Sequence, residues 1–362
     1  MPVSKLPLIQ PDQTYRVGLI GYGLAGQVFH APLIQATAGL ELSAIVTSDP
    51  GRQEDARRVY PGARIVDTPA QLWEHASSLD LAVVASPNRT HVPLALAALA
   101  AGLHAVVDKP LAPTPAEALQ LIDEAKRRKR ILTVFHNRRW DGDFLTIRRL
   151  LSEGALGAPL RFESRFERWR PVPKPGWREQ GSPEEAGGLL YDLGSHLIDQ
   201  ALVLFGPASH VYAELDRRRP LVEVDDDAFV AITHTSGVRS HLFMSAVAAQ
   251  PGPRFRLLGS EAAYVKYGLD VQEAALRSDR GLGGTGYGED PRDAWGQLGH
   301  GDETRPVPTE TGGYQRFYEG VVNALRTCGP PPVDPADAVA GLEVIEAARQ
   351  SAVEGKVIEL RK

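Results

Sequence analysis

A carboxylate and an imidazole lie close together in the segment GGLLYDLGSHLIDQAL (residues 187–202). Asp192 and His196 are four residues apart, so on a helix they share one face, one turn apart. A carboxylate in that position can orient an imidazole that acts as a general base, or balance its charge. The pair could also bind a metal or serve packing and capping. Because the segment offers no clear further ligand, we expect no metal site here.

A lysine ends the apolar run HAVVDK (104–109), which predicts a buried strand. A lysine in that position is costly to desolvate unless it has a partner or a chemical role. Pro110 fixes the backbone directly after it and stops the strand. We therefore expect Lys109 to point into a cleft at the edge of the sheet. A structural salt bridge to Asp108 is the alternative.

Three glycines, Gly21, Gly23 and Gly26, follow the apolar run RVGLIG and open a helical pattern. In this context the spacing is typical of a dinucleotide site. The first glycine permits a tight turn, the second lets the backbone approach a pyrophosphate, and the third lets the helix pack on the strand. The helix N-terminus offers free N–H groups to the phosphates. A tight turn without a ligand is the alternative. The predicted cofactor residues of the turn are Gly21, Tyr22, Gly23, Leu24, Ala25 and Gly26.

The end of the second predicted strand indicates which dinucleotide binds. A site that prefers NAD usually has Asp or Glu there, which binds the ribose 2′-hydroxyl. This chain has Thr47 and Ser48, followed by Asp49 and Arg52. Hydroxyl groups beside a guanidinium suit a 2′-phosphate, because arginine binds phosphate through two hydrogen bonds. We therefore expect NADP as the preferred cofactor, while Asp49 keeps NAD as an alternative.

The loop SPNRTH (86–91) follows the fourth predicted strand, at the edge of the sheet where open α/β folds bind ligands. Asn88 could donate a hydrogen bond to the cofactor. His91 could be a cofactor partner or a packed residue of the first helical turn. The predicted cofactor residues outside the glycine turn are Thr47, Ser48, Arg52, Ser86, Pro87, Asn88, His91, Asp108, Lys109 and Asn137.

Six apolar runs alternate with helical patterns between residues 15 and 136. Strands that are apolar throughout and separated by helices form a parallel sheet covered on both faces. This region therefore predicts a doubly wound dinucleotide-binding domain of the Rossmann type, preceded by a flexible arm over 1–14. The predicted strands are 16–21, 40–47, 63–67, 79–86, 104–109 and 130–136, and the predicted helices are 24–36, 52–59, 69–75, 90–101 and 114–129.

The pattern changes over residues 137–362, where several predicted strands follow one another without intervening helices. This favours an α+β domain with an open, mostly antiparallel sheet, so the chain as a whole is predicted to be α/β. The Gly-rich segment 281–301 predicts a long loop, and loops of that length are often functional. The predicted strands are 159–170, 209–215, 228–235, 240–247, 255–259 and 262–266, and the predicted helices are 144–153, 189–205, 314–327 and 335–354.

The composition is that of an ordinary globular protein. The 362 residues are 43% hydrophobic and 23% charged, with a net charge of −5. A nucleic-acid-binding protein would lean basic, so we expect no nucleic-acid partner. No apolar run reaches the ~18 residues of a membrane-spanning helix, and the N-terminus lacks a signal-peptide pattern. A single cysteine, Cys328, can form no internal disulfide. We therefore expect a cytoplasmic protein with no membrane partner.

Together these motifs resemble the glucose-fructose oxidoreductase, inositol dehydrogenase and rhizopine-catabolism (Gfo/Idh/MocA) family of NAD(P)-dependent oxidoreductases, over nearly the whole chain. The family's Glu-Lys-Pro signature stands here as Asp108-Lys109-Pro110, which keeps the lysine. More narrowly, GYGLAGQVFHAPLI, HNRRWDGDFLTIRRLL and YDLGSHLIDQAL are similar to the NADP-dependent scyllo-inositol dehydrogenase subgroup. The residues that carry this narrower likeness are His136, Asn137, Arg138, Arg139, Trp140 and Asp141.

The resemblance implies an enzyme that transfers a hydride between nicotinamide and a secondary alcohol of a cyclic polyol or sugar. His196 would be the general base, Asp192 would orient it or share its proton, and Lys109 would bind the reacting oxygen. Asn137 would help to seat the cofactor or substrate. The second domain would bind the substrate and form a homodimer or homotetramer. The predicted substrate-binding residues are Lys109, Arg138, Trp140, Arg165, Trp169, Asp192, His196 and Tyr287.

Three other functions remain open at this point. Some proteins with such folds bind a dinucleotide and act as regulators, although a regulator would need only the binding half and not Lys109, Asp192 and His196 together. The same site could reduce a non-sugar carbonyl. It could also catalyse hydrolysis through transient oxidation by a tightly held NAD.

Overall fold

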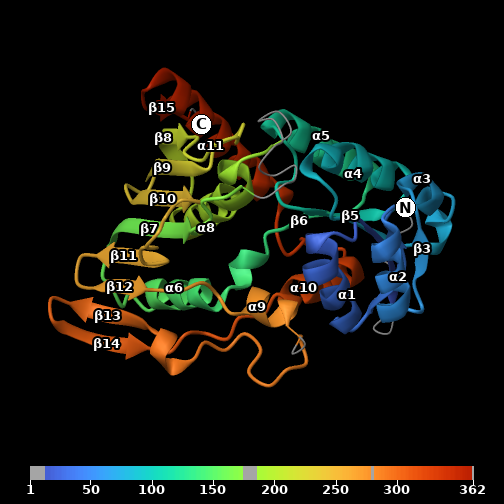
Figure 1. Ribbon diagram of the computed structural model, residues 1–362, viewed down its shortest axis with the longest axis horizontal. Helices are drawn as coiled ribbons and strands as arrows, with labels where there is room; N and C mark the ends of the chain where they lie inside the picture. Colours follow the sequence, from blue (N-terminus) through green and yellow to red (C-terminus); the bar gives the residue numbers. More distant parts are fainter. Residues whose placement is uncertain (1–12, 174–185, 279–280, 361–362) are drawn as a thin grey trace, which may run out of the picture.

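The computed structural model describes residues 13–173, 186–278 and 281–360, which form two β-sheets with helices packed on them (Figure 1). The predicted N-terminal arm lies almost wholly outside these ranges. Within them, no helix is both long and apolar enough to cross a membrane.

The first sheet has six parallel strands in the order β3-β2-β1-β4-β5-β6. The order reverses between β1 and β4, and open α/β sheets bind ligands outside the carboxyl ends of strands at such a point. Every predicted strand and helix of this region is present, with ends within two residues of the prediction. The strands are β1 (Tyr15–Ile20), β2 (Leu40–Val46), β3 (Arg64–Val66), β4 (Leu81–Val84), β5 (His104–Asp108) and β6 (Leu132–Phe135). The helices are η1 (Ala25–His30), α1 (Ala31–Ala36), α2 (Pro50–Val59), α3 (Pro69–Trp73), η2 (Ala76–Ser78), η3 (Asn88–Thr90), α4 (His91–Ala100) and α5 (Pro115–Arg128).

The second sheet has nine strands in the order β14-β13-β12-β11-β7-β10-β9-β8-β15. Only the β7–β10 pair is parallel among its described strands, so the predicted fold class is confirmed. The strands are β7 (Pro159–Glu167), β8 (Ala208–Asp216), β9 (Asp227–His234), β10 (Arg239–Ser245), β11 (Phe255–Gly259), β12 (Ala263–Lys266), β13 (Gly296–His300), β14 (Glu303–Val307) and β15 (Ile358–Glu359). The helices are η4 (Asn137–Trp140), α6 (Gly142–Ser152), η6 (Leu190–Gly194), α8 (Ser195–Phe205), α9 (Gln272–Arg277), η7 (Arg292–Ala294), α10 (Gln315–Thr327) and α11 (Pro335–Glu354).

The prediction of a continuous loop over 281–301 is wrong in its second half. The segment GQLGH forms β13 and pairs with ETRPV in β14, so a hairpin extends the sheet. Two glycines and a short length hide this strand, because β-propensity is low at glycine. The short helix α9 was also missed, since six residues are too few for a clear helical period.

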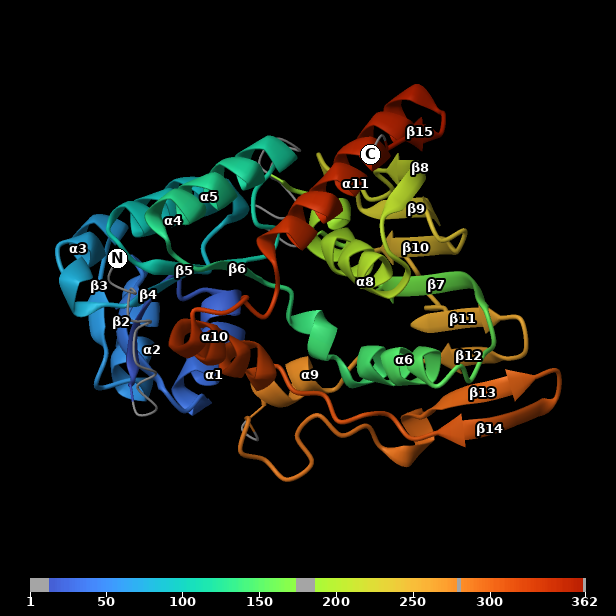
Figure 2. The ribbon, with the colours of Figure 1, turned by 180° about the vertical axis from the view of Figure 1, so that it is seen from behind.

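One face of the second sheet is covered by α6 and α8 (Figures 1 and 2). Along β7, Phe162 and Phe166 are fully buried, and the Phe162 ring lies 5.4 Å from the ring of Phe205 on α8. Successive side chains of a strand point to opposite faces. Arg165 therefore points to the other face of the sheet, which α8 does not cover.

The two sheets are joined through the C-terminal helices (Figure 2). Helix α10 packs against α1, and the Phe317 ring on α10 lies 4.9 Å from the ring of Phe135 on β6. Helix α11 packs against both α5 and β8. Nearby, the Thr133 hydroxyl donates to the Val333 carbonyl at 2.7 Å. These contacts hold the carboxyl edge of the first sheet beside the helix that carries Asp192.

Candidate active site

Lys109 and Asp192 meet where the two parts of the molecule face each other. The Lys109 ammonium donates to the Asp192 carboxylate at 2.9 Å and to the Asp192 carbonyl at 2.6 Å. The two side chains are 12% and 27% exposed. Asp108, the alternative partner, accepts from the backbone N–H of Lys109 at 2.9 Å, and no ion pair between the two side chains is present in the described residues. The lysine therefore reaches across to the second domain, with one of its three N–H donors left for a ligand.

His196 lies one turn after Asp192, near the start of α8, and is 7% exposed. Its Nδ1 is buried and has no hydrogen-bond partner within the described ranges. Burial, followed by the positive charges of Lys109 and Arg138, holds the pKa of the imidazole well below its usual 6.5. The ring is therefore neutral near pH 7 and able to accept a proton.

Contacts with Asp225 fix the backbone at the start of the helical segment that carries Asp192 and His196. The Asp225 carboxylate accepts from the Leu190 N–H at 2.7 Å, and its carbonyl accepts from the Leu189 N–H at 3.0 Å. Gly188 has a φ of +94°, and a Cβ there would lie 2.1 Å from the Asp225 carboxylate. The first turns form the π-helical segment η6, a wide turn that occurs often at functional sites. Asp225 lies 33 residues from Asp192, so the sequence patterns gave no sign of this contact.

The glycine turn has the shape that a dinucleotide needs. Gly21 has a φ of +100°, and a Cβ there would lie 2.6 Å from the Ala85 carbonyl oxygen. A Cβ on Gly26 would lie 2.0 Å from the Gly21 carbonyl oxygen. A Cβ on Gly23, by contrast, would meet only the Arg52 guanidinium, at 3.7 Å. The turn is therefore packed on its inner side and open at Gly23, where a pyrophosphate can approach the backbone.

The other predicted residues of this turn differ in what they offer. Leu24 is 42% exposed beside the open side of the turn, and Ala25 is half-buried. The Tyr22 side chain is buried, and its hydroxyl donates to Asp55 at 3.2 Å. Tyr22 can therefore face a cofactor only through its backbone.

The candidate residues for the adenosine ribose, at the end of β2, differ in their exposure to solvent. Ser48 and Arg52 are exposed, whereas Thr47 is buried. Asp49 is the N-cap of α2, and its carboxylate accepts from the Arg52 N–H at 2.9 Å. The carboxylate is thus used at the helix start, while the Arg52 side chain extends toward Gly23.

The loop after β4 acts mainly as scaffold. His91 is fully buried, and its two ring nitrogens lie 2.9 Å from the Ser86 carbonyl oxygen and 2.8 Å from that of Pro110. Of the two alternatives for His91, the packed residue is therefore the one observed. Asn88 is also buried and donates to the Ala186 carbonyl at 3.0 Å, so its amide connects this loop to the segment before η6.

The remaining predicted cofactor residues lie along the same edge. Ser86 exchanges a 2.6 Å hydrogen bond with the Thr90 hydroxyl, and Pro87 is half-buried beside it. Asp108 lies at the end of β5, with the His30 ring 3.9 Å from its carboxylate. Asn137 is 5% exposed at the start of η4.

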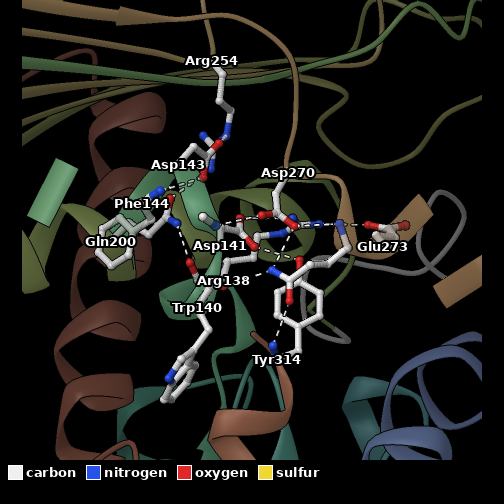
Figure 3. Close-up of polar contacts among 12 residues, drawn as sticks. Arg138, Trp140, Asp141, Asp143, Phe144, Gln200, Arg254, Asp270, Glu273 and Tyr314 are labelled. Atoms are coloured by element: carbon white, nitrogen blue, oxygen red, sulfur yellow. Dashed lines mark hydrogen bonds and ion pairs between the residues drawn. The ribbon is translucent and has the colours of Figure 1, made fainter. Parts of the chain in front are cut away.

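Arg138 is the centre of a buried polar network (Figure 3). Its guanidinium contacts Glu273 at 3.0 Å and Asp141 at 3.4 Å, and it lies 4.7 Å from the centroid of the Phe166 ring. Asp141 in turn accepts from the Tyr314 hydroxyl at 2.7 Å. Arg138 is therefore held in place by its near neighbour Asp141 and by partners from two distant parts of the chain, Glu273 and Phe166.

This network contains three buried carboxyl groups, those of Asp141, Asp143 and Asp270 (Figure 3). Burial, followed by the charge of Asp270, raises the pKa of Asp141 well above 3.8. Burial also raises the pKa of Asp143, and it raises the pKa of Asp270 to about 6. We therefore expect the network to keep at least one proton near neutral pH.

Two further predicted substrate-binding residues, Trp140 and Tyr287, lie near this network. The Trp140 ring is half-buried and packs against Phe317, with ring centroids 5.8 Å apart. The Tyr287 hydroxyl is buried and has no hydrogen-bond partner within the described ranges. Burial, followed by the charges of Asp270 and Asp141, raises the pKa of Tyr287, which places this side chain beside the Arg138 network.

The structure does not bring Arg165 to the Lys109–Asp192 pair. Its guanidinium lies 4.3 Å from the centroid of the Phe243 ring and 3.1 Å from Glu163, on the face of the sheet opposite to α8. The alternation of β7 turns it away from Asp192. Trp169 is 57% exposed beyond the end of β7, where its backbone bridges to Val247, and none of its described contacts joins it to Lys109.

Sequence reasoning gave no role to His136, whose ring is the neighbour of His196. The two ring centroids are 6.4 Å apart, and His136 Nε2 lies 3.8 Å from the Asp199 carboxylate. Arg139 binds that carboxylate through two hydrogen bonds of 2.9 and 2.6 Å. Asp199 follows His196 by three residues, and this helical spacing was the available signal.

A doubly wound sheet with a glycine turn, joined to a second domain that supplies an acid and an imidazole, defines a dinucleotide-dependent oxidoreductase. Residues 15–136 match the family model described as "Oxidoreductase family, NAD-binding Rossmann fold". Residues 148–360 match the one described as "Oxidoreductase family, C-terminal alpha/beta domain". The chain belongs to the Gfo/Idh/MocA oxidoreductase family.

Similar proteins span the whole chain. The uncharacterized oxidoreductase YdgJ of Escherichia coli is 42% identical over 93% of this chain and 96% of its own length. The scyllo-inositol 2-dehydrogenase (NADP(+)) IolW of Bacillus subtilis is 34% identical over 96% of both chains. Among solved structures, the oxidoreductase YvaA of Bacillus subtilis is 33% identical with a TM-score of 0.90, covering 97% of this chain and 99% of its own.

The glycine turn generates a paired prediction. Gly26→Ala should lower the melting temperature by several degrees, because its Cβ would collide with a backbone oxygen that cannot move away. Gly23→Ala should leave the melting temperature nearly unchanged but weaken dinucleotide binding at least ~10-fold, because it fills the open side of the turn. Thermal unfolding and calorimetric titration with NADP+ measure the two effects. Equal behaviour of the two variants in both assays would contradict this assignment.

The Arg138 network generates a pH prediction. A raised folded-state pKa means that the stability contributed by protonated Asp141 is fully present below ~pH 4 and is lost as the pH rises through the raised value. Asn resembles the protonated acid and keeps the acceptor for Tyr314. The melting temperature of Asp141→Asn minus that of the unaltered protein should therefore increase from pH 5 to pH 8. Asp302→Asn, at the exposed β13–β14 turn, is the control. A difference that stays constant or decreases would exclude a raised pKa at Asp141.

Proposed function

We propose that this protein is an NADP-dependent dehydrogenase that oxidises a secondary alcohol of a cyclic polyol or sugar. The observation that carries the proposal is the contact of Lys109 with Asp192 at the carboxyl edge of a dinucleotide-binding sheet, with His196 one helical turn after Asp192. Binding a dinucleotide requires neither Asp192 nor His196, which come from the second domain. Their presence in one place supports catalysis over the alternative of a dinucleotide-binding regulator.

Each of the three side chains has a distinct task in this proposal. When bound, the nicotinamide ring supplies the hydride acceptor. The neutral imidazole of His196 would accept the hydroxyl proton as general base. The remaining N–H of Lys109 would donate to the reacting oxygen and stabilise negative charge on it. Asp192 contacts the Lys109 ammonium, so its geometry supports a role in holding the lysine rather than in orienting His196.

The substrate class is supported by the relatives and by the polar lining of the site. One relative that covers nearly the whole chain is a scyllo-inositol 2-dehydrogenase. A ring with several hydroxyl groups needs several donors and acceptors around it. Arg138, whose charge helps to lower the pKa of His196, and Tyr287, whose buried hydroxyl has no partner within the described ranges, would supply such groups. Scyllo-inositol is therefore the first substrate to test.

The preference for NADP is supported by the end of β2. Asp49 caps α2 through one carboxylate oxygen, which commits that oxygen to the helix start and leaves the other for NAD as the alternative cofactor. The exposed Ser48 and Arg52 can contact a 2′-phosphate through hydrogen bonds and charge.

The proposed roles of Lys109 and His196 generate an activity prediction. Lys109→Met and His196→Gln should each lower kcat for scyllo-inositol oxidation at least ~100-fold, because each removes a group that acts on the reacting hydroxyl. The melting temperature should change by only a few degrees, since Asp192 is 27% exposed and water can solvate it without Lys109. Absorbance of the reduced nicotinamide measures turnover.

His210→Gln is the control for both variants, because His210 is exposed on β8. Near-normal turnover by either site variant would refute its role. If the unaltered protein reduces neither NADP+ nor NAD+ with any member of a panel of inositols and aldoses, the proposed function itself fails.

The β2 end generates a cofactor prediction. The unaltered protein should have a higher kcat/KM for NADP+ than for NAD+. Arg52→Ala should lower the ratio of the two values at least ~10-fold, because one charge-assisted contact to the 2′-phosphate is lost. Arg127→Ala on α5, where Arg127 pairs with Glu124, is the control. A clear preference of the unaltered protein for NAD+ would overturn the assignment.

A further inference from the structure

Three guanidinium groups surround one buried phenyl ring at the end of β7. The Cζ atoms of Arg138 and Arg168 each lie 4.7 Å from the centroid of the Phe166 ring, and that of Arg254 lies 5.7 Å from it. Phe166 is fully buried. Stacking against an aromatic ring holds a guanidinium plane in a defined orientation.

The three arginines differ in how their charges are balanced. Arg138 pairs with Glu273 and Asp141, and Arg254 lies 3.9 Å from the Asp143 carboxylate. Arg168 has no carboxylate within 4 Å in the part of the chain that the structure describes. Its guanidinium is half-buried, and an arginine stays protonated under all ordinary conditions. No carboxylate of the described residues therefore contacts this partly desolvated cation, and the charges of Asp192 and Glu273 act on it only from a longer distance.

This cation lies beside the proposed reaction site. Arg168 follows Phe166 by two residues, so it lies on the side of β7 that faces α8, opposite to Arg165. Burial, followed by the charge of Arg170, lowers the pKa of Arg168, while the charge of Asp192 raises it. The guanidinium is thus close enough to Asp192 to feel its charge, and Asp192 contacts Lys109.

We propose that Arg168 binds an oxyanion substituent of the substrate, so that the preferred substrates are anionic polyols or sugars. This inference rests on the proposed dehydrogenase function and narrows its substrate class. The planar fork of a guanidinium matches a carboxylate or a phosphate through two parallel hydrogen bonds. The neighbouring Arg138 cannot serve equally, because Glu273 and Asp141 already bind its guanidinium.

The arrangement of the arginines around Phe166 favours binding of an anion in two ways. A half-buried cation that no carboxylate of the described residues contacts costs free energy in the free protein, and a bound anion recovers part of that cost. The phenyl ring and the neighbouring charges fix the guanidinium before the ligand arrives, which lowers the ordering cost of binding. A neutral polyol would displace water from the Arg168 guanidinium without supplying a negative charge in its place.

The test compares matched neutral and acidic ligands with the full-length protein loaded with NADPH. The pairs are D-glucose with D-glucuronate, D-galactose with D-galacturonate, and myo-inositol with myo-inositol 1-phosphate. Calorimetric titration gives each Kd without requiring turnover. In at least one pair the acidic member should bind about ten- to a hundredfold more tightly, the range expected for a charge-assisted hydrogen-bonded pair. The uronates and the phosphate distinguish the two kinds of oxyanion.

A variant assigns the effect to Arg168. Arg168→Gln should remove most of the preference for the acidic ligand while it changes the Kd of the neutral one less than about threefold. Arg256→Gln is the matched control, since Arg256 pairs with Glu163 on the opposite face of the sheet and should change neither value. Melting temperatures of both variants show whether they are folded, and the comparison of ligand pairs in the unaltered protein stands without them.

Two results would overturn the inference. One is the absence, in every pair, of a preference for the acidic ligand greater than threefold. The other is an equal loss of neutral and acidic binding in Arg168→Gln, which would make Arg168 a contact to ring hydroxyls. The proposed function is decided separately, by reduction of NADP+ during turnover of neutral polyols, so either proposal can fail while the other stands.

Discussion

The ion pair between Lys109 and Asp192 is the contact on which the site depends, because it joins the two halves of the molecule. The lysine comes from the end of a strand in the first sheet, and the aspartate comes from a helix that packs on the second. Neither sheet alone could complete the pair. The Asp225 carboxylate and Gly188 fix the start of the helix, so the aspartate is presented at a defined point. The Lys109–Asp192 pair can therefore form only when the two domains are correctly placed relative to each other.

The distribution of charge around this pair explains why the nearby imidazole can act as a base. Lys109 and Arg138 both disfavour a second positive charge, so the buried ring of His196 stays neutral. On the other side of Arg138 the opposite problem arises, because Asp141 and Asp270 are two buried acids close together, and protons relieve their repulsion. Near neutral pH the site thus combines a neutral imidazole with a group of acids that keeps at least one proton, and in both places burial is the main cause.

Features that depend on a few consecutive residues could be predicted from the sequence. The glycine turn, the strands of the first sheet and the lysine at a strand end each depend on a few consecutive residues, and the structure has them within two residues of the prediction. Contacts between distant segments were beyond its reach. Neither Asp225 at the start of the helix nor Glu273 beside Arg138 follows from any spacing. The alternation in 159–170 predicted a strand, but only packing against α8 shows that Arg168 faces the site and Arg165 does not.

The polar residues of the loop after β4 connect the dinucleotide-binding sheet to the segment that carries Asp192. His91 lies between the Ser86 carbonyl of that loop and the Pro110 carbonyl next to Lys109. Asn88 connects the same loop to the segment before Asp192. The proposed hydride transfer would need a near-attack geometry, in which a misplacement of about 1 Å is costly. His91 and Asn88 hydrogen-bond to backbone carbonyls, so their side chains fix the backbone beside Lys109 and before Asp192.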